Sequence, residues 1–493
     1  MLNKCIFLLL ALSLFAGCSH KEIPSLVQTR DDHAICDLDY IYSTIDIPCE
    51  PLTLKGIIDI AWRHNWDVLA KELEWAVQRE VTTREMLRML PSFTFNGEWS
   101  HRNKRTASRT QLIPSGIRTP PSIGSEQRVR AWDATLSFKV IDFALAYYQS
   151  QESSWRALGL YMQYARLKQN MILEIYKSYW KAMSARWGAK KSQEILALIA
   201  EYREKFDREM DARYISRVPG LRIEDQMLNF QVQLYSFEFT YQNAKAELAA
   251  LMGIPADVQF ELAEVEMDAF PELEPIEELE QIALRSRPEL YNSDFEENIS
   301  TEQVRQAVIR TFPSTEIFKS YRTNLDRFLV HHHWIVTGLR VAWDLLSVPQ
   351  HIFDIKAAQL GRDRAYVARL ALSVGVMTQV NIAYFDYLNI SEQYKIREDI
   401  YNVRTRLADA SWMEFYRGEF NMVDVILSRA SAIQGGVDAI SAYGQKQIAL
   451  EQVNNSIGQP LRFNTLLEIY EEDDEGQQEQ DDNQDCSCEE IIE

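Results

Sequence analysis

This 493-residue sequence lacks, after residue 18, any run of 18 or more apolar residues. A helix that crosses a bilayer needs about 20 such residues, so no transmembrane helix is predicted in this part of the chain. A closed β-barrel can also cross a bilayer, and its strands carry a much weaker hydrophobic signal. Insertion of the chain into a membrane as part of a β-barrel therefore stays an open alternative.

Positive charge is also scarce, since 72 acidic residues outnumber 52 basic ones and leave a formal net charge of −20. Nucleic acid is not expected as a partner, because proteins bind its phosphates through basic surfaces. An acidic chain suits cationic cargo better.

The sequence contains no P-loop, no Gly-x-Ser-x-Gly and no His-Glu-x-x-His motif. We therefore expect no enzyme activity, no cofactor and no metal. Residues 331–333 are three consecutive histidines, but neighbours on a strand point to opposite faces and cannot converge on one ion without a turn. An exposed polar loop is expected there instead.

Residues 1–17 have the pattern of a signal peptide, with Lys4 before an apolar stretch and small residues before a cleavage site. Cys18 follows directly, so the segment resembles a bacterial lipobox. This resemblance implies cleavage before Cys18 and attachment of lipid to it. The alternative is an ordinary signal peptide in which Cys18 has no such role.

Four of the six cysteines remain when Cys5 and Cys18 are set aside. An even number in an exported protein favours disulfides, and Cys36 and Cys49 could close a short loop. Cys486-Ser487-Cys488 is too tight for a relaxed bridge between its own members, so the pairing of these two cysteines stays open.

The same pattern occurs twice along the chain. Pro91 and Pro313 each end a helical stretch, because proline cannot continue the helical hydrogen-bond ladder. Each proline is followed by an extended segment, a polar loop, a second extended segment and a very long helical run. Each half then ends with a similar short sequence, at residues 248–255 and 453–460. We therefore predict a duplicated unit of helix, hairpin and long helix.

This duplication sets the expected boundaries. The first repeat, residues 51–255, is predicted to contain helices at 52–90, 143–209 and 221–253 and strands at 93–100 and 131–141. The second repeat, residues 276–461, is predicted to contain helices at 276–311, 349–416 and 420–457 and strands at 315–325 and 333–343. A polar extension (18–50), an acidic linker (256–275) and an acidic disordered tail (462–493) complete the chain.

The helix predicted at 143–209 would span on the order of 100 Å. Pro219-Gly220 is predicted to turn the chain, and the returning helix at 221–253 is too short to match its long partner. The helix at 52–90 is therefore expected to lie end to end with the returning helix.

The predicted strands alternate apolar and polar side chains, which indicates a sheet with one apolar face and one wet face. Trp99, Trp132 and Trp334 suit an aromatic belt at a membrane interface. Four strands cannot close on themselves in a bilayer, because open edges would leave unsatisfied backbone groups in lipid. Other copies of the chain would have to complete the ring.

Several features together resemble the TolC-type family of outer-membrane efflux and secretion channels. They are Leu52-Thr53-Leu54, the Pro-Ser pairs at 91–92 and 313–314, Val341-Ala342-Trp343-Asp344-Leu345-Leu346, and a tip turn with Phe415, Gly418, Asp424 and Val425. The resemblance covers roughly residues 51–461. It implies a mostly α-helical fold with a small β-barrel portion, in which three copies form a 12-stranded outer-membrane barrel continued by a periplasmic α-helical coiled-coil barrel.

The resemblance also implies where barrel and helices meet. Pro91 and Pro313 would mark the junctions from helix to strand, and Asp142 and Asp344 the junctions from strand to long helix.

In this family, acidic side chains at the tunnel tip constrict the pore and select cations. Asp424 matches one such position, but the second falls at Leu427 here. Asp225 is the nearest acidic residue in the first repeat. The alternative for Asp424 is a residue that caps or solvates the start of a helix.

The implied function is passage rather than chemistry. The family forms homotrimers in the bacterial outer membrane that extend into the periplasm and dock on a periplasmic adaptor and an inner-membrane pump of RND or ABC type. The resemblance thus implies a lipid-anchored exit duct for small molecules. Two alternatives stay open: the outer-membrane component of a type I protein secretion system, and a non-conducting lipid-anchored coiled-coil scaffold.

Overall fold

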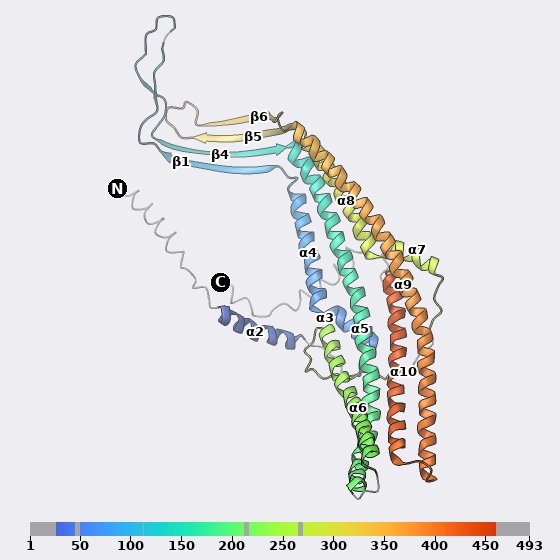
Figure 1. The fold of residues 1–493 in the computed structure, drawn as a ribbon. Helices are drawn as coiled ribbons and strands as arrows, with labels where there is room; N and C mark the ends of the chain where they lie inside the picture. The colour runs from blue at the N-terminus through green and yellow to red at the C-terminus, as the bar shows by residue number, and fades with distance from the viewer. Residues whose placement is uncertain (1–25, 45–49, 112, 212–215, 265–269, 460–493) are drawn as a thin grey trace.

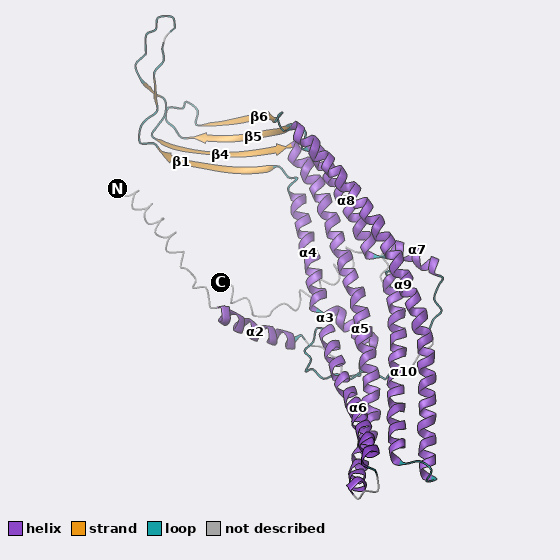
Figure 2. Ribbon diagram, in the orientation of Figure 1, coloured by secondary structure: helices purple, strands orange, loops and turns teal. Residues whose placement is uncertain are grey.

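The computed structural model describes residues 26–44, 50–111, 113–211, 216–264 and 270–459. A four-stranded sheet lies at one end of a long helical body, whose helices run from the sheet to two tips at the other end (Figure 1). The strands are confined to the sheet end of the molecule (Figure 2). The expected signal peptide, Cys18, Cys49, Cys486, Cys488 and the acidic tail lie outside the described residues.

The first repeat begins with two helices, α3 (Leu54–His64) and α4 (Trp66–Leu87), and continues with strand β1 (Ser92–His101). A short pair, β2 (Ala107–Ser108) and β3 (Ser122–Ile123), lies within the following loop. Strand β4 (Arg128–Lys139) leads directly into α5 (Val140–Asp211), and α6 (Arg217–Leu251) returns along α5. Helix α5 has 72 residues, which is roughly 108 Å of helix.

The second repeat has the same order of elements. It contains α7 (Ile276–Ser286), α8 (Pro288–Ile309), β5 (Ser314–Asn324), β6 (His333–Ala342), α9 (Val348–Tyr416) and α10 (Met422–Ser456). The four main strands and the two long helices begin and end within three residues of the positions predicted from the sequence.

The single helices predicted at 52–90 and 276–311 are wrong, because each is broken into two. Asn65 separates α3 from α4 in an extended conformation, and its side chain accepts hydrogen bonds from the N–H groups of Asp67 and Val68. Asn65 is therefore the N-cap of α4. Arg287 separates α7 from α8, and Pro288 takes the first position of α8, where a helix needs no N–H donor.

The four strands form one antiparallel sheet in the order β1-β4-β5-β6. The central pair, β4 and β5, joins the two repeats. Strands β1 and β6 are therefore the edges, and each pairs on one side only within the described chain.

The helices lie side by side in a corresponding order. Helix α4 packs on the half of α5 near the sheet, and α6 packs on the distal half (Figure 1). Helices α8 and α10 pack on α9 in the same end-to-end manner. The predicted end-to-end arrangement is confirmed for both repeats.

The duplication extends into the core. One hydrophobic cluster lies at the joint between α4 and α6, and a second lies at the joint between α8 and α10. They are built from corresponding residues: Ile57, Ala61, Ile175, Ala244 and Leu248 in the first, and Leu279, Ala283, Val380, Ala449 and Val453 in the second.

The N-terminal extension contains a helix that the sequence did not predict, α2 (Leu26–Ser43). Its end docks on the first repeat, where the Tyr42 hydroxyl donates to the Asp257 carboxylate at 2.9 Å and the Tyr40 ring lies 5.9 Å from that of Trp66. Cys36 lies on this helix and is partly buried. Its predicted disulfide partner, Cys49, lies outside the described residues.

Candidate functional site

One face of the sheet is mostly apolar, with Lys319 and Thr337 as polar exceptions in its middle. Partners in an antiparallel register point to the same face, so the pairs Phe93–Leu136 and Phe138–Ile317 share this face. An aromatic ladder crosses all four strands on it. Its ring centroids are 5.9 Å apart for Phe95 and Trp132, 5.4 Å for Trp132 and Tyr321, and 6.3 Å for Tyr321 and His333. Phe93, Phe95 and Leu136 on this face are 69, 67 and 49% exposed, and contiguous exposed apolar side chains mark a surface that contacts a membrane or another protein.

The opposite face is polar and hydrogen-bonded. Asn96 donates to Asp133 at 3.2 Å, and the Thr135 and Ser320 hydroxyls lie 2.8 Å apart. Near the helices, Arg340 forms a 2.7 Å ion pair with Glu316. The sheet can therefore separate an apolar phase from water.

The register corrects one expectation about the aromatic belt. Trp334 pairs with Arg322, which in turn pairs with Asp133, so Trp334 lies on the polar face. Trp99 and Trp132 lie on the apolar face. The alternation of β6 is less regular than that of β4, which is why the sequence alone did not separate the two faces there.

Pro91 and Pro313 lie at the junctions from helix to strand. Each comes directly before a strand, β1 or β5, and after the last turn of a helix, α4 or α8. In both repeats that last turn is closed by a backbone hydrogen bond of 3.1 Å. The two junctions are thus built alike.

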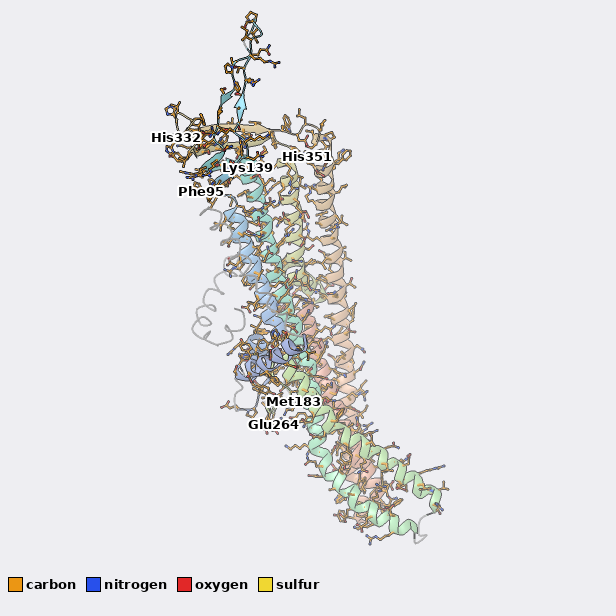
Figure 3. The ribbon with its side chains drawn as sticks, turned by 90° about the vertical axis from the view of Figure 1, so that its left-hand side faces the viewer. Phe95, Lys139, Met183, Glu264, His332 and His351 are labelled. Atoms are coloured by element: carbon orange, nitrogen blue, oxygen red, sulfur yellow. The ribbon has the colours of Figure 1, made fainter. Side chains whose placement is uncertain are left out.

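Asp142 and Asp344 lie at the junctions from strand to long helix. Asp142 is in the first turn of α5, with its carboxylate 3.3 Å from Lys139 Nζ. Asp344 comes just before α9, and its Oδ1 accepts a hydrogen bond from the N–H of Leu346 at 3.1 Å. Lys139 and His351, the latter in the first turn of α9, lie where the sheet meets the helices (Figure 3).

Asp424 lies at the tip formed by α9 and α10. Gly418 turns the chain with a positive φ of 77°, and Asn421 caps α10 by accepting the N–H of Asp424 at 2.9 Å. The cap is therefore Asn421 rather than Asp424. The Asp424 carboxylate occupies the first turn of α10, where the helix dipole favours negative charge.

Asp225 is exposed on α6, and it accepts a hydrogen bond from the Asn229 side chain at 3.3 Å. Met227 and Ile426 each lie two residues beyond Asp225 and Asp424, and both belong to one hydrophobic cluster. The two carboxylates therefore lie near the same end of the helical body, on different helices.

The turn predicted at Pro219-Gly220 is wrong. Helix α6 begins at Arg217, so these two residues lie in its first turn. Proline is tolerated there because the first N–H groups of a helix have no partner within the helix.

The breaks at Asn65 and Arg287 form joints that sequence analysis missed. Asn65 Nδ2 donates to the carbonyl of Leu251 at 2.9 Å and thereby ties the start of α4 to the end of α6. Gly253, with a φ of 73°, lies directly against the backbone of the break. Gly458, with a φ of 84°, occupies the corresponding place against Arg287.

A partly buried ion cluster reinforces the second joint. Arg166 Nε lies 2.6 Å and Arg287 Nη2 lies 2.9 Å from Glu289 Oε1. Burial raises the pKa of Glu289, but the hydrogen bond from Arg287 and the charges of both arginines outweigh it and lower the pKa overall. Arg166 also donates to the Asn455 carbonyl at 3.1 Å. The cluster thus links α5 of the first repeat to α8 and α10 of the second.

Two helix faces carry exposed apolar side chains at coiled-coil spacing. On α9 they recur every seven residues, at Phe353, Leu360, Val367 and Val374, and are 69, 69, 61 and 58% exposed. On α6 they alternate four and three residues apart, at Leu228, Val232, Tyr235 and Phe239. Helices α9 and α6 lie at opposite edges of the helical body. We call these two faces the α9 seam and the α6 seam.

Among the described residues, no group of three or more His, Cys, Asp or Glu side chains is arranged to hold a metal ion. His333 is instead 3.2 Å from the Thr323 hydroxyl, and His332 is 3.2 Å from the Asn324 carbonyl. The part of the chain that the structure describes contains no helix long and apolar enough to span a membrane.

The fold is that of bacterial outer-membrane channels. The structure matches the CmeC outer-membrane channel of Campylobacter jejuni with a TM-score of 0.67 and 14% identity, over 85% of this chain and 88% of that one. It matches the open state of the MtrE outer-membrane channel of Neisseria gonorrhoeae with a TM-score of 0.65 and 15% identity, over 82% and 88%. It matches the outer-membrane protein VceC of Vibrio cholerae with a TM-score of 0.63 and 8% identity, over 82% of this chain and 96% of that one.

No protein-family model matches the sequence, and no curated protein matches it. The likeness is therefore one of fold, and it confirms the mostly α-helical fold that the sequence resemblance implied, while the closed barrel and the three copies stay predictions.

Proposed function

We propose that three copies of this chain form a lipid-anchored channel in a bacterial outer membrane, the exit duct of a tripartite efflux system. One observation carries the proposal: the sheet has an apolar face, a polar face and two open edges. The likeness in fold to outer-membrane channels supports it.

The open edges require more than one copy. Unpaired backbone groups in lipid cost several kcal/mol each, so β6 of one copy must pair with β1 of the next. Two copies would give eight strands, and side chains fill the interior of a barrel of about that size. Three copies give twelve strands, which leaves room for water around the axis.

The helices favour the same head-to-tail closure. The α9 seam is on the side of β6, and the α6 seam is on the side of β1. A ring in which β6 meets β1 therefore brings the α9 seam, which lies near the sheet, towards α4 of the next copy, and brings the distal half of α9 towards the α6 seam of the next copy. Both seams would then be buried as in a coiled coil, and a helical barrel would continue the β-barrel into the periplasm.

This assembly assigns roles to the lipid anchor, the helix tips and the acidic residues. Lipid on Cys18 would anchor the chain to the membrane, and the helix tips would contact a periplasmic adaptor that connects to an inner-membrane pump. The pump supplies the energy, and the channel is passive. Three copies of Asp424, with Asp225 nearby, would form a ring of negative charge that attracts cations at the tip.

The test uses the full-length protein extracted in detergent. Mass photometry should give the mass of three chains, and planar lipid bilayers should show discrete current steps. A lone protomer, or a trimer that gives no current steps, would overturn the channel and favour a scaffold.

A second measurement separates cargo classes. Deletion of the gene should increase accumulation of a cationic dye in cells. Unchanged dye accumulation with loss of a protein from the culture medium would favour the type I secretion system instead.

A further inference from the structure

The outer end of the β1–β4 hairpin, which comprises the loop and the adjoining ends of both strands, is basic in an otherwise acidic chain. Residues 101–130 contain seven Lys or Arg residues and one acidic residue, although the whole chain carries a net charge of −20. The loop lies at the end of the sheet away from the helices, as does His332 in the second hairpin (Figure 3).

Part of this charge lines a pocket of about 470 Å³. Its charged and titratable lining residues are His101, Arg105, Glu126, Arg128, Arg130 and Arg327. Glu126 is already paired, since its carboxylate lies 2.6 Å from Arg327 Nε. Arg105, Arg128 and Arg130 have no ion pair with any carboxylate of the described chain. The pocket therefore presents uncompensated positive charge.

Three of the residues that line the pocket, His101, Arg128 and Arg130, lie on the apolar face of the sheet. His101 pairs with Arg128, and Trp99 pairs with Arg130, so these residues share the face of Trp132. At a strand rise of ~3.3 Å per residue and a strand tilt of about 35–45°, Arg130 lies about 19–22 Å from Phe138 along the barrel axis. Lipid-facing bands of outer-membrane barrels are about 25 Å tall. The arginines thus lie close to the outer edge of the apolar band.

We propose that this pocket binds the phosphate groups of a phosphorylated glycolipid in the outer leaflet of the membrane. The proposal rests on the channel function above, which places the apolar face in lipid. Guanidinium groups bind phosphate oxygens in bidentate fashion, and basic clusters next to a membrane surface attract anionic headgroups. The acyl chains of the same molecule would lie on the adjoining aromatic ladder.

The position of the pocket distinguishes a lipid from a soluble anion. A free phosphate would use only the arginines and would leave the adjoining apolar face uncovered. A glycolipid satisfies both surfaces at once. Each protomer carries one such pocket, so a trimer would hold three lipids around its outer rim.

The experiment measures binding of diphosphorylated lipid A to the intact detergent-solubilised trimer by native mass spectrometry. Arg105, Arg128 and Arg130 are together replaced by Gln. The matched control replaces Lys104, Arg109 and Arg118, which lie in the same loop but do not line the pocket, by Gln. Both variants remove three positive charges per chain.

We expect the pocket variant to bind lipid A at least tenfold more weakly than the unaltered protein, and the control variant to bind within about twofold of it. Monophosphorylated lipid A should bind more weakly than the diphosphorylated form. Inorganic pyrophosphate at the same concentration should not displace the lipid. Equal binding by the two variants, or displacement by pyrophosphate, would overturn the proposal.

Single-channel conductance of both variants separates this proposal from the channel itself. Unaltered current steps together with unaltered lipid binding would reject the lipid site and leave the channel standing.

Discussion

At the scale of single residues, Gly253 and Gly458 each allow the end of a return helix to lie directly against the backbone of a helix break. Both have positive φ, and both end a return helix with the pattern of a Schellman motif, in which Ile254 N–H bonds to Ala249 O and Gln459 N–H bonds to Asn454 O. Each also touches the backbone of a helix break. A side chain at either position would separate the two helices that the joint brings end to end.

Replacement of Gly253 by Ala should therefore destabilise the protein by about 3 kcal/mol or more, because its Cβ would overlap the His64 carbonyl oxygen. Gly418 provides a matched control: its φ is similarly positive at 77°, but nothing lies within 4 Å of an added Cβ. Gly418→Ala should cost only ~1 kcal/mol for the left-handed backbone. Thermal unfolding of the two variants measures the difference, and equal losses would contradict the steric role of the joint.

Glu451 on α10 should make stability depend on pH. Burial raises the pKa of this carboxyl to about 7, and the hydrogen bond from Asn454 only partly opposes the rise. The folded state therefore keeps a proton that the unfolded state releases above pH ~4.5, so the free energy of unfolding should fall as pH rises from about 5 to 8. Glu451→Gln should remove about 2 kcal/mol of this dependence.

Unfolding midpoints measured at pH 5, 6, 7 and 8 test this prediction. Glu174→Gln is the control, because Glu174 is 56% exposed and forms its one ion pair within the described residues with Lys177. A pH dependence that persists in Glu451→Gln would show that other groups cause it.

Asp424→Asn should weaken cation selectivity, because three carboxylates near the axis attract cations and repel anions. Reversal potentials in a tenfold gradient of KCl measure the effect. Glu419→Gln, in the same turn but outside helix α10, should change them less. Reversal potentials that do not move in Asp424→Asn would remove this residue from the gate.

At the scale of secondary-structure elements, the predicted bounds were most accurate where a long periodic pattern was not interrupted by other local interactions. Helices α5 and α9 and the four strands fall into this class. The breaks at Asn65 and Arg287 were missed because the helical pattern continues across them, and the interactions that end α3 and α7 come from distant residues such as Leu251 and Gly458. Two local features did indicate the breaks: Asn65 is a residue type that often caps the start of a helix, and Pro288 is a residue type that often occupies the first position of a helix.

The two faces of the sheet were predictable for β1 and β4 but not for β6. The side chains of β4 alternate cleanly, whereas β6 places Trp334 and Val336 on the polar face. Only the register shows this, because a face is defined by its cross-strand partners rather than by one strand.

The sheet faces can be tested with one pair of substitutions. Leu136→Arg places a charge on the apolar face, which should cost about 2–4 kcal/mol per chain when the barrel folds into lipid. Thr94→Arg is a matched control, because Thr94 pairs with Thr135, one residue from Leu136, but faces the polar side. Folding into vesicles, followed by heat-modifiable mobility on gels, should fail for Leu136→Arg and proceed for Thr94→Arg. The opposite order would show that the faces are reversed.

At the scale of the whole molecule, strands and helices share one lateral order. From one edge of the sheet to the other, the strands follow the order β1, β4, β5, β6. In the same direction the helical body begins with α4 and α6, continues with α5, then with α8 and α10, and ends with α9. Each edge of the sheet therefore lies above an exposed helix seam. The sequence alone could not identify these seams, because apolar residues at heptad spacing also occur inside the protomer, and only the fold shows which of them remain uncovered.

The α9 seam should control assembly. Replacing Leu360 and Val367 together by Asp would bury two unpaired charges at each interface between copies, and each such charge costs several kcal/mol. We expect the mass in detergent to fall from three chains to one, with loss of current steps. Arg362→Asp is the control, since this position lies about 140–200° around α9 from the two seam residues and its side chain is 45% exposed beside Asp363. It reverses a charge without entering the seam, so it should stay trimeric. A Leu360→Asp, Val367→Asp variant that kept the mass of three chains would show that the copies meet through other surfaces.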